Sequence, residues 1–485
     1  MDSPNVDVLA RMPLAESVML LWKWVTCPER LEAIWEEHRG RCYEKQISFD
    51  VMVHLIADAL IKHQGSGRKA FELGIENEEL GASLQAAYQK LGRLPIEVSQ
   101  AFLTKCSSAL SEAYPLWAEY RLPNSLKKFR VLVVDGKAIK RAAKRLKPLQ
   151  GLNGGLLGGR ALTAFDWCNG LVCGLIATED GEANDKRFTG ELVQQVREVK
   201  SEKLLWIGDS AFCDLTQPAH FASREGDHFL VRYHPGIPFF LDEKKATKSG
   251  IDELGRKYTQ SWGWLGSPNN KRRIYVRRIE VARDGQKPLI LITDLLDSDQ
   301  YPAIDLLLLY RERWSIETVF QQVTDVFGLK HLIGGTPKAC VFQLAFCMII
   351  HNMLQVVRGY IAKGNDVEPQ DVSVEKVFQD VEEQLIAWNI VIDLDVTTEY
   401  FSQSLTLSQL QKRLDKLLGN AWRERWRKAP PQNRTHVESK KKRTVGRSGH
   451  NSVYRILLDH AKKPKKTKHK ATRKTLTALA DKPRN

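Results

Sequence analysis

The sequence predicts an α/β protein whose central sheet is preceded and followed by helices. Two apolar runs, FRVLVVDGK (129–137) and KLLWIGDSAF (203–212), each stop at an aspartate beside a glycine, a pattern typical of buried central strands. A hairpin pattern lies between them, and a long apolar helix pattern follows at 301–327. We therefore expect a mixed sheet with helices packed on its faces.

The first 125 residues have apolar side chains at helical spacing, and we assign residues 1–125 to a helical N-terminal region. Ser48 and Ser83 each precede such a run and are expected to cap it. The clearest of the predicted helices span 14–24, 48–63 and 83–91.

The pattern changes to strands at residue 128. After the first strand, a basic stretch at 137–149 contains six Lys or Arg residues. A hairpin is expected next, turning at Asn169-Gly170, and helices should precede and follow the second strand. The expected elements are strands at 160–167, 171–178 and 228–233 and helices at 187–199 and 214–224. This succession is the order of a ribonuclease H-like fold, with a catalytic domain over 126–360.

The chain between the second strand and the long helix is too long for a compact version of that fold. Residues 234–295 contain strand-like segments, including SWGWLG and RRIYVRRIEVA. We therefore expect a β-rich inserted subdomain there.

Three acidic residues lie where such a fold would bring them together. Asp135 and Asp209 end the two apolar strands, and Glu317 lies on the long helix, four residues after Arg313. Ligands bind at the carboxyl ends of strands in open α/β sheets, and carboxylate oxygens suit Mg²⁺ or Mn²⁺. Each acid taken alone is as well explained by a turn, a helix cap or a surface ion pair.

The three acids, in their local sequences VVDGK, IGDSAF and YRERWSIE, resemble the DDE triad of bacterial insertion-sequence transposases. The likeness is to the cut-and-paste branch, which carries the signature Tyr-x2-Arg-x3-Glu-x6-Lys. Tyr310, Arg313 and Glu317 match this signature, but its last position is Thr324 instead of lysine. Lys330 and Lys338 are the alternatives for the missing charge.

The resemblance implies a transposase that cuts double-stranded DNA at its element's ends and joins the 3′-hydroxyl ends to target DNA. Asp135, Asp209 and Glu317 would be both catalytic residues and ligands of two Mg²⁺ or Mn²⁺ ions. A homodimer in the DNA complex and a place with the nucleoid in a bacterial cytoplasm are also implied.

The resemblance and the local chemistry together suggest DNA contacts. A tryptophan of the insertion could stack on a flipped base, although ordinary hydrophobic packing is the better explanation of either candidate taken alone. The N-terminal segment 81–103, with Gln85, Tyr88, Lys90 and Arg93, is a further candidate for recognising the DNA end, or else a helical cap on the catalytic domain. The proposed DNA-binding residues are Tyr310, Arg313, Lys137, Lys140, Arg141, Trp262 and Trp264.

The C-terminal part is expected to contain two regions. Residues 361–430 read as helices, and the apolar stripe of 408–418 could form a dimer contact or pack on its own domain. Residues 431–485 form a basic tail. From 437 onward, 16 Lys and Arg face three acids, so most of the net charge of +15 lies there. Such a tail favours a polyanionic partner.

The remaining composition points to a cytoplasmic protein. The eight cysteines show neither a CxxC pair nor zinc-ligand spacing, as expected in a reducing compartment. The start of the chain lacks a signal-peptide pattern. The longest apolar stretch, 341–357, is interrupted by polar residues, which predicts a buried helix and no membrane span.

Two other functions remain open from the sequence. One is a metal-dependent nuclease of the same fold, which cuts DNA without joining it. The other is a DNA-binding remnant of a transposase that has lost catalysis, an alternative to which Thr324 gives some weight.

Overall fold

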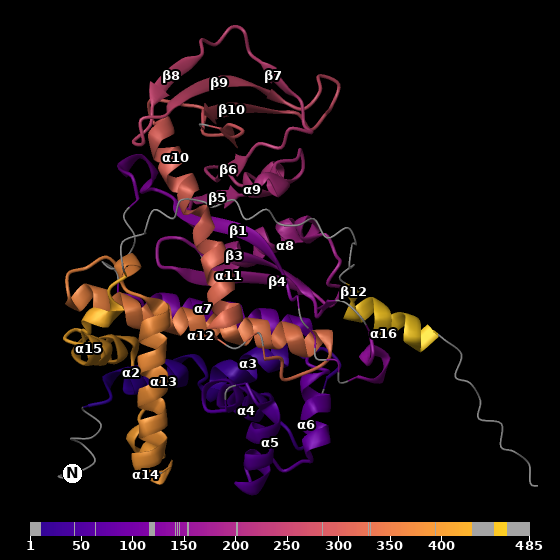
Figure 1. Ribbon diagram of the computed structural model, residues 1–485, viewed down its shortest axis with the longest axis vertical. Coiled ribbons are helices and arrows are strands. Elements are labelled where there is room, and N and C mark those ends of the chain that lie inside the picture. Colours follow the sequence, from indigo (N-terminus) through magenta and orange to yellow (C-terminus); the bar gives the residue numbers. More distant parts are fainter. Residues whose placement is uncertain are drawn as a thin grey trace, which may run out of the picture.

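The computed structural model describes residues 11–462, apart from 43, 64, 116–121, 141, 143, 145, 153–154, 200–201, 284, 328, 330, 393 and 429–450. Its centre is a ten-stranded sheet with helices on both sides and a block of helices at one end (Figure 1). The core strands are β1 (Arg130–Ala138), β3 (Arg160–Asp166), β4 (Leu171–Thr178), β5 (Leu204–Gly208) and β6 (His228–Arg232).

These five strands lie in the order β4-β3-β1-β5-β6. β1 pairs antiparallel with β3 and parallel with β5, and β5 pairs parallel with β6. The inner strands are buried, which explains why β1 and β5 read as continuous apolar runs. The predicted hairpin is the β3–β4 pair, which turns at Gly170 with a positive φ of 75°.

The inserted segment extends this sheet and does not form a separate one. Its strands continue the order beyond β6 as β11-β10-β9-β7, because β11 pairs antiparallel with β6. The strands expected within 234–295 are therefore present, and they continue the central sheet. These strands are β7 (Phe239–Leu241), β8 (Lys248–Ile251), β9 (Lys257–Leu265), β10 (Ile274–Val281) and β11 (Leu289–Thr293).

The long helix expected at 301–327 is interrupted. It consists of α10 (Ala303–Arg311), a 3₁₀ turn η5 (Glu312–Trp314) and α11 (Ser315–Asp325). Figure 1 shows these elements running one after the other across the face of the sheet. The helices around the second strand are shorter than predicted: α8 covers Thr189–Val199 and α9 covers only Gln217–Phe221.

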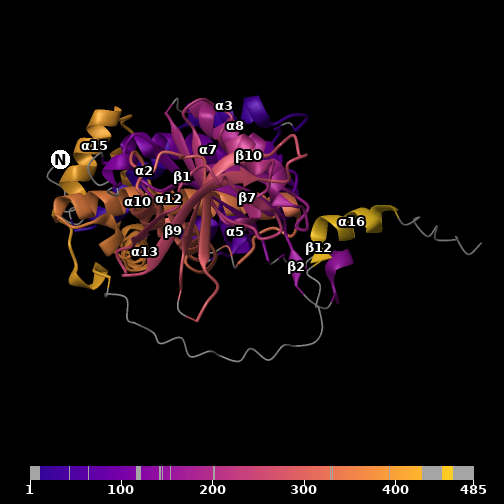
Figure 2. The ribbon, with the colours of Figure 1, turned by 90° about the horizontal axis from the view of Figure 1, so that it is seen from above.

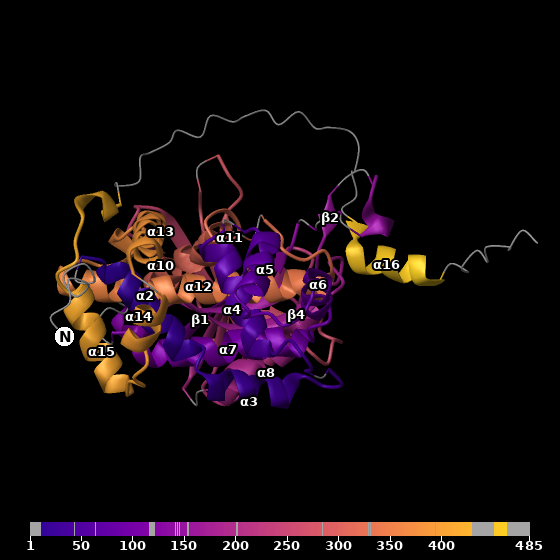
Figure 3. The same ribbon diagram turned by 90° about the horizontal axis from the view of Figure 1, so that it is seen from below.

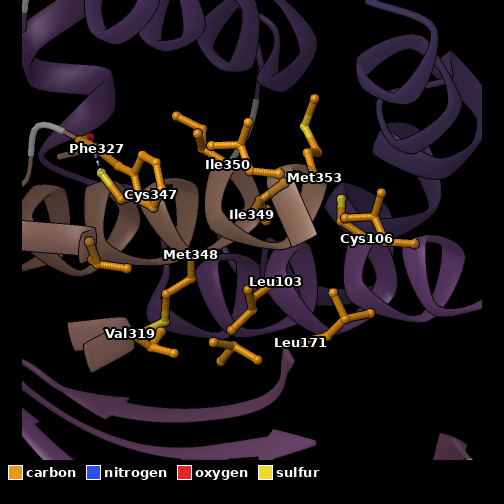
Figure 4. Packing of buried hydrophobic residues seen from close by; sticks show 14 of the residues in the cluster. Leu103, Cys106, Leu171, Val319, Phe327, Cys347, Met348, Ile349, Ile350 and Met353 are labelled. Carbon is orange, nitrogen blue, oxygen red and sulfur yellow. Dashed lines mark hydrogen bonds between the residues drawn. The ribbon is translucent and has the colours of Figure 1, made fainter. Parts of the chain in front are cut away.

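Helix α12 (Pro337–Gly364) forms the centre of the hydrophobic core. It is long and apolar enough to span a membrane, but its apolar window is entirely buried within the protein. Its polar residues bond neighbouring elements: Asn352 accepts from Val172 N at 2.8 Å and donates to Ser107 Oγ at 2.8 Å. Figure 4 shows its side chains packed with Leu103 and with Val319 of α11. The prediction of a buried helix is confirmed.

The N-terminal helices pack against α12. Ser48 and Ser83 accept hydrogen bonds from Val51 N and Ala86 N, so both predicted N-caps are confirmed. Figure 3 shows several of these helices together on one side of the molecule. They are α2 (Pro13–Val25), α3 (Pro28–His38), α4 (Phe49–Ile61), α5 (Gly67–Glu76), α6 (Leu84–Leu91) and α7 (Ile96–Ala113).

The C-terminal helices follow the within-chain packing that was one of the two alternatives for 408–418, and they differ in part from the basic tail expected at 431–485. The apolar stripe of α15 (Leu407–Leu418) is buried against α2 and α12, so it packs within its own chain. Beyond it lie α16 (Val453–Lys462) and the short strand β12 (Asn451–Ser452), which pairs with β2 (Leu156–Leu157). Figure 2 shows α16 on the opposite side of the molecule from α15. Part of the region predicted as a basic tail is therefore a folded element. Helices α13 (Val374–Val391) and α14 (Leu394–Tyr400) complete the set.

Candidate active site

The two strand-associated aspartates lie side by side in the sheet. The parallel pairing of β1 with β5 ends at Val133 and Ile207, and the same register carried two residues further places Asp135 beside Asp209. Asp135 lies within β1 and not at its end as predicted, because the pairing with β3 continues through Ala138. Asp135 therefore lies just beyond the parallel pairing of β1 with β5, while β1 itself continues to Ala138.

Local backbone contacts fix both carboxylates. Asp209 follows β5 and accepts a hydrogen bond from Ala211 N at 2.7 Å, so it caps the next 3₁₀ turn. Asp135 Oδ1 accepts from Gly136 N at 2.8 Å. Gly136 must be glycine because a Cβ there would lie 1.8 Å from Asp185 Oδ2.

Arg313 joins the strand to the helix. Its guanidinium lies 3.8 Å from Asp135 Oδ2 and 3.0 Å from Glu317 Oε1. The arginine is buried, with 8% of its side chain exposed, whereas 42% of the Glu317 side chain is exposed. The i, i+4 geometry persists although Arg313 lies in the 3₁₀ turn before α11. The structure therefore places Asp135, Arg313 and Glu317 in one cluster.

The other two acids affect the electrostatics of Asp135. Burial raises the pKa of Asp135 to about 6, and the neighbouring Asp209 and Glu317 add to this shift. The Gly136 amide and Arg313 oppose it. A carboxyl group crowded by two other acids is an unfavourable arrangement that a bound cation would relieve.

The residues fit a divalent cation in chemistry but not in their present positions. Among residues 11–462, as far as they are described, no three His, Cys, Asp or Glu side chains lie close enough to hold a metal ion together. Arg313 occupies the space between Asp135 and Glu317. Three carboxylates are nevertheless a hard oxygen donor set of the kind that Mg²⁺ or Mn²⁺ prefers. For these carboxylates to bind a cation together, the Arg313 side chain would have to move away from Asp135 and Glu317.

Tyr310 lies within the same cluster. It is buried, with 5% exposed, and burial raises the pKa of its hydroxyl to about 12, while Arg313 and Arg232 oppose the shift. The phenol therefore stays protonated and can donate a hydrogen bond at neutral pH. Arg232, at the end of β6, is a basic residue near the site that the sequence did not single out.

Lys137 reaches from β1 to the helix that carries Glu317. Its ammonium donates to the carbonyl of Phe320 at 3.3 Å and lies 5.2 Å from the centre of the Phe320 ring. Thr324 donates to the same carbonyl at 2.7 Å. Burial lowers the pKa of Lys137, and Lys140 contributes to the lowering. A cation is therefore present beside the position where the signature would have its lysine.

Of the two lysines considered as substitutes, Lys338 does not provide this charge. Lys338 lies 3.8 Å from Glu179, which it pairs with. Lys330 lies outside the described residues, as does Arg141. Lys140 is exposed.

The two tryptophans of the insertion have different environments. Trp262 is buried, with 1% exposed, and donates to the carbonyl of Leu296 at 2.9 Å. The suggestion that it stacks on DNA is therefore wrong for this conformation, because its ring packs in the sheet. Trp264 is 37% exposed and carries Arg273 over its ring at 4.3 Å. Its strand β9 is four positions from β5, a distance of about 19 Å at the usual strand spacing.

The N-terminal candidate segment is partly committed to packing. Lys90 lies over the Trp35 ring at 4.1 Å, and Tyr88 packs edge-on against Phe71. The observed contacts thus favour the helical-cap interpretation for these two side chains, and the role of the segment in DNA recognition stays a prediction.

Comparison with known families identifies the central region. Residues 126–353 match the family described as the transposase DDE domain. This part of the chain is a transposase DDE domain. It begins just before β1 and ends within α12, so it contains Asp135, Asp209 and Glu317.

Other comparisons add less. The cryo-EM structure of the piggyBac transposase synaptic complex with hairpin DNA is similar at 10% identity. The similarity covers 83% of this chain and 85% of that chain, with a TM-score of 0.37. No curated protein matches the chain.

A cationic pocket on the other side of α11 was not predicted. It brings together Arg311 of α10, Arg358 of α12 and Lys428, which follows the 3₁₀ turn Glu424–Trp426. Because these residues are far apart in the sequence and match no motif, only the folded chain reveals them.

Proposed function

We propose that this protein is a DNA transposase that cuts at the ends of its own element and joins the freed 3′-hydroxyl groups to target DNA. The observation that carries the proposal is the cluster of Asp135, Arg313 and Glu317 beside Asp209, within a transposase DDE domain. The strand order β4-β3-β1-β5-β6, with its parallel and antiparallel pairs, supports a ribonuclease H-like core.

Asp135, Asp209 and Glu317 would hold two divalent cations, Mg²⁺ or Mn²⁺. Such ions activate the attacking oxygen and stabilise the leaving 3′-oxygen of an in-line displacement. The three carboxylates must be ionised for this role, and a nearby cation favours the ionised form of Asp135.

The other residues of the cluster would bind and orient the DNA strand. Arg313, once released from Asp135 and Glu317, has a planar guanidinium suited to a phosphate group. Tyr310 donates from its neutral hydroxyl, and Lys137 presents its ammonium beside Phe320. These groups position the scissile phosphate against the carboxylates, and positioning is a large part of phosphoryl-transfer catalysis.

The wider proposal includes partners and location. Element ends and target DNA are the double-stranded partners, a homodimer is the working unit because two ends must be joined, and the bacterial cytoplasm is the compartment. Lys140 and Trp264 are proposed to touch DNA outside the cluster because both are accessible at the surface.

The test is cleavage of a labelled duplex carrying the flanking element ends, in the presence of Mg²⁺. Wild type is compared with Glu317→Gln, and Glu383→Gln serves as the matched control because Glu383 is 68% exposed on α13. We expect nicking and strand joining in wild type and in the control, and DNA binding without cleavage in Glu317→Gln. Cleavage without joining would instead favour a nuclease, and binding without cleavage by wild type would favour an inactive remnant.

A further inference from the structure

A polar cavity of about 320 Å³ lies behind the catalytic helix. It is lined by Ser315, Thr318, Val319 and Gln322 of α11. These positions lie on the side of the helix opposite Glu317, since they differ from it by about 100 to 200° at 100° per residue. The cavity is therefore distinct from the carboxylate cluster, although one helix contributes to both.

The charges around the cavity are mainly positive. Arg311, Arg358 and Lys428 line it, and Glu312 is the one acid among its lining residues. Partial burial and the nearby Arg358 lower the pKa of Lys428, while Glu375 and Asp371 oppose the shift. The positive charges of Arg358 and Lys428 favour an anion in the cavity. Glu375, which also lies near Lys428, already accepts hydrogen bonds from Gln322 and Ser373.

Two buried polar atoms in the cavity wall have no hydrogen-bond partner among the described residues. They are Ser315 Oγ and Gln355 Oε1, and Gln355 is only 2% exposed. The orientation of the Gln355 amide follows from His351. The ring of His351 bonds the carbonyl of Gly170 at 3.1 Å through Nε2, so its Nδ1 accepts from Gln355 Nε2.

Buried polar atoms are almost always paired with protein or ordered water, so these two atoms are available to a hydrated ligand in the cavity. Ser315 can donate to an anionic oxygen. The Gln355 oxygen needs a donor, which a hydrated phosphate ester brings with its bound water. Cations, a hydroxyl donor and a site for water together match a phosphate group.

The cavity is also connected to the catalytic cluster. Trp314 lines it and is 61% exposed. Arg313 lies over the Trp314 ring at 4.8 Å, and Arg313 also holds Asp135 and Glu317. A group bound in the cavity would therefore be separated from the carboxylates only by this arginine–tryptophan pair and the helix.

We propose that this cavity binds a backbone phosphate of the DNA, away from the scissile phosphate, and so holds the strand against the back of the catalytic helix. The proposal rests on DNA being the substrate of the protein. Arg311, Arg358 and Lys428 supply the charge, and Ser315 supplies a hydroxyl hydrogen bond.

The experiment measures how DNA affinity changes with salt, in metal-free buffer so that the duplex stays intact. Each phosphate contact contributes about 0.9 to the slope of log K against log salt for duplex DNA. The variants Arg311→Gln and Lys428→Gln each remove one accessible cation of the cavity. Arg427→Gln is the matched control, since Arg427 is the neighbouring exposed cation, pairs with Glu424 and does not line the cavity.

We expect each cavity variant to lower the slope by about 0.9, equally for element-end and unrelated duplexes, while the control keeps the wild-type slope. Thermal melting of the three variants checks that they fold. Wild-type slopes in both folded cavity variants would overturn the proposal. Binding of the mononucleotide dAMP to wild type but not to Arg311→Gln, with unchanged DNA slopes, would also overturn it by assigning the cavity to a free nucleotide.

The result is separable from the proposed function. If the slopes fall in the cavity variants but wild type never cuts DNA, the phosphate site stands and the transposase activity fails. If wild type cuts and joins DNA while the slopes stay unchanged, the activity stands and the phosphate site fails.

Discussion

Asp135 and Asp209 occupy neighbouring positions in the sheet but have different surroundings. Asp135 lies inside a strand, is 21% exposed, contacts Arg313 and has its pKa raised to about 6. Asp209 lies beyond its strand and caps a 3₁₀ turn through Ala211 N. The first carboxylate is therefore unfavourable for folding, whereas the second stabilises its own turn. Two residues proposed to share one function should differ in what they contribute to stability.

The largest expected effect is on DNA cleavage, and it should be the same for both aspartates. Asp135→Asn and Asp209→Asn should each reduce DNA cleavage by on the order of 10³-fold or more, because each removes a proposed ligand of a catalytic cation. Duplex binding without metal should be retained. The measurement is single-turnover cleavage of labelled element ends, and cleavage that survives in either variant removes that residue from the site.

Both aspartates should also contribute to metal binding. Mg²⁺ should raise the free energy of unfolding of wild type by about 2.7 kcal/mol at a concentration of 100 times Kd. Either Asn variant should lose most of this gain, because the donor set is then incomplete. Thermal melting with Mg²⁺ and with a chelator measures the difference, and equal melting temperatures for wild type in the two buffers would contradict the metal site.

Stability without metal should separate the two residues. At pH 7 Asp135→Asn should increase the free energy of unfolding by about 3 kcal/mol, since the pKa rises from 3.8 to about 6 and each pKa unit corresponds to about 1.4 kcal/mol. The raised pKa means that folded wild type binds the proton more tightly than the unfolded chain does. Wild type should therefore lose stability as the pH rises from about 4 to about 6, relative to Asp135→Asn. Urea unfolding in chelator at several pH values tests this, and a constant difference would refute it.

Removing the positive charge of Lys137, two residues after Asp135, should have a smaller effect on the cleavage rate. Lys137→Met should slow cleavage about tenfold, in line with the loss of one charged hydrogen bond to phosphate. Thr324→Lys in the same chain should restore most of the rate, because both side chains meet at the Phe320 carbonyl. Lys338→Met is the control, since Lys338 pairs with Glu179. If Thr324→Lys does not raise the cleavage rate of Lys137→Met, Lys137 does not supply the charge expected at the lysine position of the signature.

The smallest effect concerns the cap. Asp209→Ala should destabilise the metal-free protein by about 1 kcal/mol because the turn loses its acceptor, whereas Asp209→Asn should change stability little, as asparagine caps equally well. Chelator-treated samples unfolded in urea give both values. An alanine variant as stable as the asparagine variant would show that the cap is dispensable.

The sequence by itself determined the elements whose physics is local. Apolar runs, turn glycines and helix caps predicted β1, β5, the β3–β4 hairpin and the buried helix α12, and the Ser48 and Ser83 caps were correct in detail. The acids proposed for the site could also be singled out from the sequence, because an aspartate is unusual in an apolar strand and the spacing of Arg313 to Glu317 is fixed by helix geometry.

Only the tertiary structure decided which distant residues meet. The pairing of β11 with β6 merged the insertion into the central sheet, and packing buried Trp262 while leaving Trp264 accessible. Lys137 reached Phe320, and the cavity with Arg358 and Lys428 formed. Such contacts join residues from 59 positions apart (Arg232 and Leu291) to 183 positions apart (Lys137 and Phe320). Their pairing depends on strand register and helix packing, which local sequence patterns do not encode.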